Sequence, residues 1–143
     1  MVSDIGFEID ARLKKLVEEM KKKGLRVTIQ RLAIASTVFE KIKGHPSFMD
    51  VLEEVRKRTP GVSTSTVYNT LQLMEKLGFI TSFSYRGETH YDQPHPHVNV
   101  VCMDTGKIID LPEDRDVLQL LEKKGVKVKT VVVYGYCEAS GPG

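Results

Sequence analysis

The chain has 143 residues, a length that fits one domain or two small ones. Hydrophobic residues make up 41%, as in ordinary globular proteins, and no apolar run approaches the roughly 20 residues that a membrane helix needs. Two cysteines exclude a disulfide framework. Residues 1–93 hold 15 basic and 12 acidic side chains, so this part suits a polyanionic partner. Because the N-terminus lacks a signal-peptide core, we expect a cytoplasmic protein without membrane contact.

The first half of the chain is expected to be helical. Apolar side chains recur there every three to four residues, and Thr28, a capping box at 47–50 and Ser63 or Thr64 can start three of the helices. The expected helices span residues 8–23, 29–43, 48–58 and 63–77. Gly78 ends the last of them.

The helix over 63–77 has an unusual polar face. Val67, Leu71 and Met74 form its apolar side, but the opposite side carries short hydrogen-bonding groups where a solvated face would carry Lys and Glu. Such groups suit base edges and phosphates in a DNA major groove, although an ordinary surface helix also explains the pattern. The candidate DNA-binding residues are Thr64, Ser65, Thr66, Tyr68, Asn69 and Gln72, with Arg86 in the segment that follows.

After Gly78 the hydrophobic period changes to two, which indicates strands over 79–85 and 88–92 joined by a turn at Arg86. Helices followed by such a hairpin form a winged helix-turn-helix arrangement. In it, the second helix of the pair enters the major groove and the hairpin lies over the DNA backbone.

Residues 94–143 have a different pattern, with strands expected over 98–103, 107–111 and 127–137 and a helix over 113–124. This part is too small to form a good core alone, so we expect dimerisation to cover its valine-rich last strand. The predicted fold class is α+β. An N-terminal winged helix-turn-helix DNA-binding domain (1–93) is followed by a small α/β dimerisation domain (94–143).

Histidines lie at the boundaries of these elements. His45 separates two helices, and His95 and His97 lie in the hinge, where alternate residues of an extended chain point to the same side. With Asp92 and Asp110 they form a nitrogen and oxygen ligand set suited to iron, manganese, zinc or nickel. A metal bound by both domains would fix the angle between them. From spacing alone, a turn and a solvated linker are the commoner explanation.

Other polar residues have simpler expected roles. Cys102 and Cys137 lie on different predicted strands and are expected to be small buried hydrophobes. A disulfide between them needs neighbouring strands, and cytoplasmic redox conditions disfavour it. We expect His90 to be a surface residue of the hairpin.

Several ordered motifs resemble those of the ferric uptake regulator family, from about residue 12 to 138. They are Gly24–Arg31, Ser63–Leu71, Cys102–Asp110 and Tyr134–Cys137. The resemblance implies a homodimeric, metal-dependent transcriptional repressor of iron-uptake or peroxide-stress genes. It would bind a palindromic operator in double-stranded DNA, use one Fe²⁺, Mn²⁺ or Zn²⁺ per subunit, and have no catalytic residues.

The resemblance also implies a regulatory metal site between the domains. Its ligands here would be His45, Asp92, His95, His97 and Asp110. The family usually has a His three residues before the first motif cysteine, where this chain has Asn99. Either His95 and His97 fill the hinge positions, or His97 and Asn99 do. We favour the first, because an amide is a poor ligand for these metals.

The chain departs from the family at two further sites. Each of the family's Cys-x-x-Cys pairs keeps one cysteine here, Cys102 and Cys137, and two thiolates cannot form a four-sulfur zinc site. We therefore expect no structural zinc. A secondary site that uses a His at the position of Lys129 is also expected to be absent. The two Asp ligands resemble those of the peroxide-sensing branch.

Two other functions compete with a metal-dependent repressor. A small metallohydrolase could use His95, His97 and Asp110 around an open zinc position. It lacks an obvious general base, however, and it leaves the helix over 63–77 unexplained. The second is a winged-helix protein that binds DNA without metal, an alternative that the loss of the paired cysteines supports.

Overall fold

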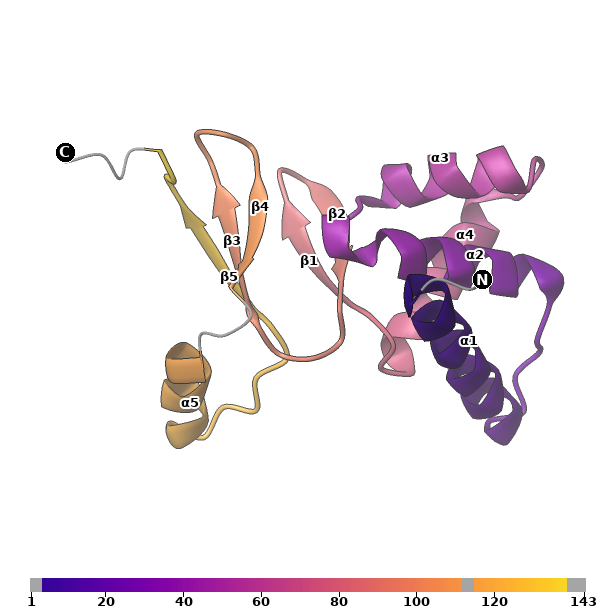
Figure 1. Cartoon of the computed structure of the whole chain (residues 1–143), viewed down its shortest axis with the longest axis horizontal. Helices are drawn as coiled ribbons and strands as arrows, with labels where there is room; N and C mark the ends of the chain where they lie inside the picture. The colour runs from indigo at the N-terminus through magenta and orange to yellow at the C-terminus, as the bar shows by residue number, and fades with distance from the viewer. Residues whose placement is uncertain (1–3, 112–114, 139–143) are drawn as a thin grey trace. The chain divides into compact units, whose positions relative to one another are not determined.

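The computed structural model describes residues 4–111 and 115–138, in two compact units, Met1–Gln93 and Pro94–Gly143. The elements of the first unit are α1 (Asp4–Lys22), α2 (Ile29–Lys41), a 3₁₀ turn η1 (Ile42–Gly44), α3 (Phe48–Arg58), α4 (Thr64–Lys76), β1 (Thr81–Tyr85) and β2 (Glu88–Asp92) (Figure 1). Those of the second are β3 (Val98–Cys102), β4 (Ile108–Leu111), α5 (Arg115–Lys123) and β5 (Val131–Gly135). The predicted α+β class is confirmed.

Most element boundaries differ from the predicted ones by a few residues. The largest difference is β5, which covers Val131–Gly135 where a strand over 127–137 was expected. Its partner β3 has only five residues, so the ladder from Val98–Val131 to Cys102–Gly135 limits its length. The predicted start of the last helix lies in 112–114, outside the described residues.

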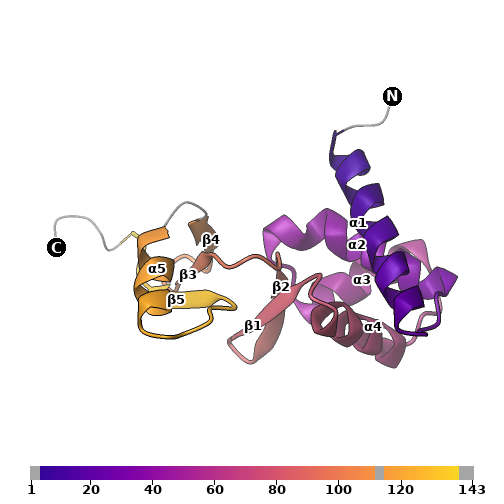
Figure 2. The same cartoon turned by 90° about the horizontal axis from the view of Figure 1, so that it is seen from below.

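The helical part of the first unit is organised around α2, which packs against α1, α3 and α4 (Figures 1 and 2). Side chains before three helices cap their first turns: the hydroxyls of Thr28, Ser47 and Ser63 each accept from a backbone N–H at 3.1 Å. The shared core is apolar and includes Leu16, Met20, Ile34, Val38, Val51, Leu71 and Met74. Burial of this kind is the main source of stability for such a unit.

Strands β1 and β2 form the antiparallel wing, with Thr81 opposite Asp92 and Tyr85 opposite Glu88. Arg86 and Gly87 have φ of 51° and 77°, so both central residues of the turn are left-handed, as a two-residue hairpin loop requires. The wing is tied to α4, because the Ser82 hydroxyl donates to a Glu75 carboxylate oxygen at 2.8 Å. This contact restrains the position of the wing relative to α4.

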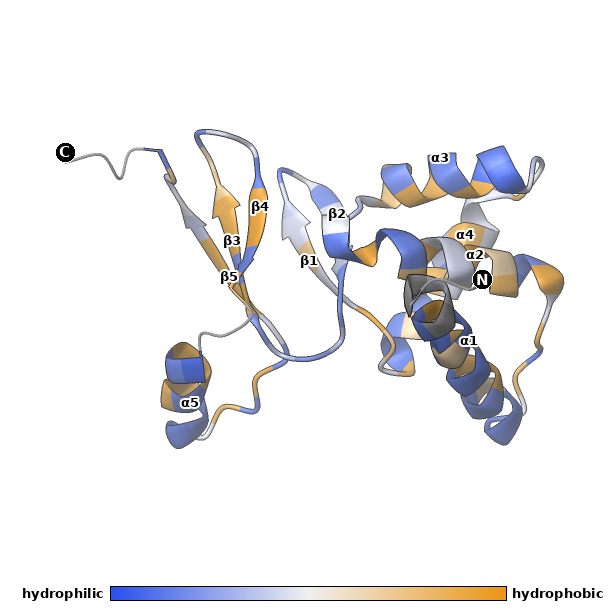
Figure 3. Ribbon diagram, in the orientation of Figure 1, coloured by the Kyte–Doolittle hydropathy of each residue, from blue (hydrophilic) through white to orange (hydrophobic). Residues whose placement is uncertain are grey.

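The second unit is a sheet with the order β4-β3-β5, in which β3 is antiparallel to β4 and parallel to β5. Figure 3 shows that β3 and β4 are largely apolar and that α5 is amphipathic. No described residue of α5 is buried within the chain. Among the residues that the structure describes, no helix has the length and apolarity to cross a membrane.

Cys102 and Cys137 form a disulfide, with Cα atoms 5.4 Å apart. The expectation against this bond is wrong, because β3 and β5 are neighbouring strands and Cys102 lies opposite Gly135. The chain after β5 is also held by Asp104, whose carboxylate accepts from the backbone N–H of Cys137 and of Glu138 at 3.0 and 2.8 Å.

Candidate functional site

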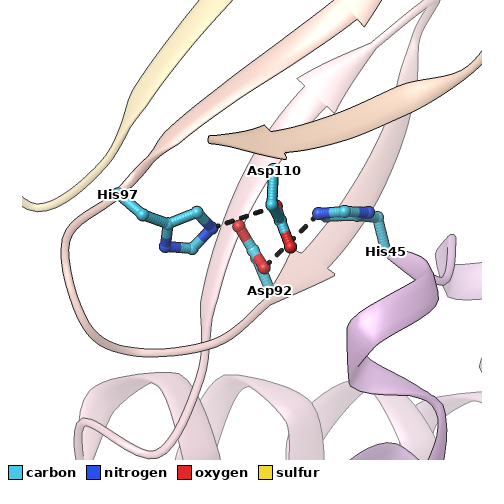
Figure 4. A group of neighbouring side chains, drawn as sticks. All are labelled: His45, Asp92, His97 and Asp110. Atoms are coloured by element: carbon cyan, nitrogen blue, oxygen red, sulfur yellow. Dashed lines mark ion pairs between the residues drawn. The ribbon is translucent and has the colours of Figure 1, made fainter. Parts of the chain in front are cut away.

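In the first unit, His45 and Asp92 form a buried pair. His45 follows η1 and Asp92 ends β2, and Nε2 of the histidine lies 3.7 Å from Oδ1 of the aspartate (Figure 4). Exposed fractions of 5% and 0% remove both side chains from solvent. A buried carboxylate is costly unless it is paired or bound to a metal, so this is a site where a cation is stabilised.

Strand β2 holds the segment that carries His45. Tyr91 donates its backbone N–H to the Pro46 carbonyl at 2.9 Å, and Ser47 forms a β-bridge with His90. The His90 side chain is 12% exposed, and its Nδ1 lies 2.8 Å from the His45 carbonyl oxygen. The expectation that His90 is a surface residue is therefore wrong, and its spacing in the sequence carries no signal of this contact.

In the second unit, His97 pairs with Asp110. Nε2 of His97 lies 3.3 Å from Oδ1 of Asp110 on β4 (Figure 4). Nδ1 of His97 lies 2.8 Å from the His95 carbonyl oxygen. A carbonyl oxygen only accepts, so Nδ1 carries a proton, and Nε2 is the ring nitrogen that faces the carboxylate. A metal-binding imidazole commonly has this orientation, in which Nδ1–H is bonded to an acceptor and Nε2 is left to bind the ion.

His95 and Asn99 are the two competing hinge candidates. The His95 side chain is exposed, and its ring centroid lies 5.5 Å from that of His97. Asn99 is fully buried and donates from Nδ2 to the Thr130 hydroxyl at 3.4 Å. The choice between them as a ligand stays a prediction.

Each His–Asp pair offers one imidazole nitrogen and one carboxylate oxygen. This combination suits Fe²⁺, Mn²⁺ and Zn²⁺, and the pairs are His45–Asp92 and His97–Asp110. Two ligands are fewer than these ions take from a protein, so neither pair is a complete site by itself.

The candidate DNA-binding side chains of α4 lie on its solvent face. Thr64, Ser65, Tyr68, Asn69 and Gln72 are exposed. The structure shows Thr66 half-buried and the apolar face of α4 buried. The polar face of α4 is therefore available to a partner, as its pattern predicts.

Two contacts constrain this face. Arg56 donates from Nη2 to the Thr64 hydroxyl at 3.0 Å, and Gln72 donates to the Tyr68 hydroxyl at 2.6 Å. Arg56 is missing from the predicted set, and the basic last turn of α3 could have indicated it. Arg86, at the wing tip, is exposed and its Cζ lies 5.2 Å above the Tyr85 ring.

Tyr91 lies beside Asp92 in the sequence, and its side chain is buried. Burial, with smaller contributions from the negative charge of Glu75 and from Tyr68, raises the pKa of Tyr91 to about 12. The phenol is therefore neutral over the whole physiological range.

The chain resembles known proteins over most of its length. The model of the ferric uptake regulator family matches residues 22–136. A ferric uptake regulation protein homolog of Archaeoglobus fulgidus is 38% identical over 123 residues, which cover 85% of this chain and 94% of the relative. The peroxide operon regulator of Bacillus subtilis is 30% identical over 133 residues, covering 88% and 91%. A solved zinc-bound manganese uptake regulator is 26% identical with a TM-score of 0.62, covering 87% of this chain and 98% of the other.

Proposed function

Because the chain belongs to the ferric uptake regulator family, and is a metal-responsive transcriptional repressor of iron-uptake or peroxide-stress genes, we propose that one divalent transition metal per subunit controls its affinity for DNA. The ligands would be the two His–Asp pairs, one from each unit, with His95 as the favoured fifth ligand and Asn99 as the alternative. The observation that carries the proposal is the orientation of His97, whose Nδ1 is held by the His95 carbonyl and whose Nε2 faces the Asp110 carboxylate.

The short chain between the two pairs supports a shared ion. Asp92 and His97 are five residues apart, so their Cα atoms are never more than roughly 18 Å from each other. Together the pairs supply two nitrogens and two carboxylate oxygens, which is enough for Fe²⁺, Mn²⁺ or Zn²⁺. A metal held by both pairs would supply positive charge to the Asp92 and Asp110 carboxylates and would thereby link the two units.

A link of this kind changes which arrangements of the units are populated. Only the arrangement that brings both pairs to one ion gains the binding free energy of the metal, so metal shifts the population toward it. A tenfold gain in DNA affinity requires a shift of only about 1.4 kcal/mol. The proposed repressor therefore needs no large change within either unit.

DNA contact is proposed for the first unit. The polar face of α4 would lie in the major groove and Arg86 would contact phosphate, as in other winged helices. We further propose a homodimer that binds a palindromic operator, because a two-fold dimer presents two such helices to two half-sites. Apolar side chains that the second unit exposes support it: Leu120, Val133, Tyr134 and Tyr136.

The test is fluorescence anisotropy on a duplex from upstream of the protein's own gene, first with chelator and then with increasing Mn²⁺. We expect the affinity of the wild type to rise at least tenfold with Mn²⁺, and that of His45→Ala to stay at the chelated value. Equal affinity with and without Mn²⁺ would instead indicate a metal-independent DNA-binding protein.

A further inference from the structure

We propose that His90 is a positioning residue for the candidate metal ligand His45. It would hold His45 in place and connect it to the wing. The inference rests on the proposed function, because it requires His45 to bind metal. His90 belongs to neither of the His–Asp pairs and lies on β2, 45 residues beyond His45. Its role would be to fix the geometry of a ligand that it does not replace.

The backbone of His45 needs such support. It has φ 51° and ψ 56°, a left-handed conformation that is uncommon for a residue other than glycine. It also precedes Pro46, and residues before proline favour an extended backbone. Unfavourable conformations of this kind persist only where surrounding contacts hold them.

Two hydrogen bonds hold both sides of the His45 residue. Its N–H donates to the Ile42 carbonyl at 3.1 Å, a contact within the local turn. Its carbonyl oxygen lies 2.8 Å from Nδ1 of His90, a contact that comes from a distant strand. Because the carbonyl only accepts, Nδ1 of His90 is the donor. The direction of the His45 side chain therefore depends on the position of β2.

Ring contacts extend this connection toward the wing tip. Phe83 of β1 stacks on His90 with centroids 5.7 Å apart, and the His45 ring meets Phe83 edge-on at 6.2 Å. His90 also lies 6.0 Å from the ring of Tyr85, over which Arg86 is placed. A continuous set of contacts thus runs from a candidate metal ligand to the candidate phosphate-binding residue. All of it lies within one compact unit.

Two substitutions separate the hydrogen bond from the ring stacking. His90→Phe keeps a ring against Phe83 but has no donor for the His45 carbonyl. His90→Asn loses the ring but places an amide N–H near the position of Nδ1. Thr89→Ala is the matched control, because it changes an exposed side chain of the same strand.

Metal binding is measured directly in full-length protein, by Mn²⁺ titration and by the visible spectrum of bound Co²⁺. We expect His90→Phe to weaken Mn²⁺ binding about tenfold or more and to alter the Co²⁺ spectrum, as losses of groups that orient ligands do. His90→Asn should recover most of the wild-type affinity, and Thr89→Ala should match the wild type. Thermal unfolding without metal separates these effects from a loss of folded protein.

Each result decides the matter. Wild-type Mn²⁺ affinity in His90→Phe overturns the positioning role and leaves the proposed function standing. Equal weakening in His90→Phe and His90→Asn also overturns it, because a hydrogen-bond donor near the position of Nδ1 would then fail to restore Mn²⁺ binding. A wild type that binds no Mn²⁺ overturns the proposed function and this inference together.

Discussion

Gln72 donates a hydrogen bond to the Tyr68 hydroxyl over 2.6 Å, between residues one turn apart on the exposed face of α4. The Tyr68 ring also contacts the Phe48 ring, with centroids 6.1 Å apart and an angle of 73° between the rings. These contacts restrict both side chains in the free protein, which would lower the entropy that they lose on binding a partner.

The first prediction concerns this pair. Tyr68→Phe keeps the ring contact but removes the acceptor for Gln72, so we expect a loss of specific DNA affinity of about 1 kcal/mol. Tyr68→Ala and Asn69→Ala should cost more, because they remove the contacting group itself. Fluorescence anisotropy with Mn²⁺, on the operator and on a scrambled duplex, measures the loss of specific affinity in each variant. If neither alanine variant weakens specific binding, α4 is not the element that reads DNA.

The second prediction concerns Arg86. Arg86→Asn removes the charge but keeps a residue that tolerates the left-handed turn before Gly87, so the wing should fold normally. DNA affinity should fall by a similar factor on every sequence, and the slope of log affinity against log salt should decrease by about one per subunit. An unchanged salt dependence would mean that Arg86 contacts no phosphate.

Local signals explain which parts of the fold could be predicted. The α4 helix follows from the Ser63 cap, the apolar spacing and Gly78, all within sixteen residues of one another. The turn of the wing follows from Arg86-Gly87 and the change of period. In both cases the information lies in neighbouring residues, so the sequence alone contains it.

Contacts between distant residues could not be predicted. The role of His90 depends on the bridge to Ser47 across more than forty residues. The Cys102–Cys137 disulfide depends on the parallel pairing of β3 and β5, which spacing does not fix. The candidate ligands were found from residue types, but the orientation of the His97 ring becomes apparent only with the His95 carbonyl in place.

The third prediction concerns the disulfide. It closes a loop with a sequence separation of 35, for which chain entropy gives a stabilisation of at most about 4 kcal/mol. Cys137→Ser, at a half-buried position, should lower the midpoint of urea unfolding of the second unit, and reductant should do the same to the wild type. Reductant should have no further effect on Cys137→Ser. Equal midpoints in all samples would show that the bond does not form in solution.

The fourth prediction concerns alkaline pH. Burial raises the pKa of Tyr91 to about 12, above the value of about 10 for an exposed phenol. The neutral, buried Tyr91 therefore contributes its full stabilisation of the folded state below pH 10. This contribution is lost as pH rises from 10 to 12, by at most about 1.4 kcal/mol per pH unit. Tyr91→Phe, which keeps the ring, should lose less stability across this window. If the urea midpoints of wild type and Tyr91→Phe changed equally with pH, the raised pKa of Tyr91 would be contradicted.

The fifth prediction asks whether the two His–Asp pairs bind one ion. If they do, His45→Ala in the first unit and Asp110→Asn in the second should each weaken the same Mn²⁺ site. The double variant should then lose less than the sum of the two single losses, because the second change acts on a site that is already lost. Calorimetry would give one Mn²⁺ per subunit for the wild type. Two independent ions with additive losses would mean that the pairs are separate sites, and that metal does not link the units.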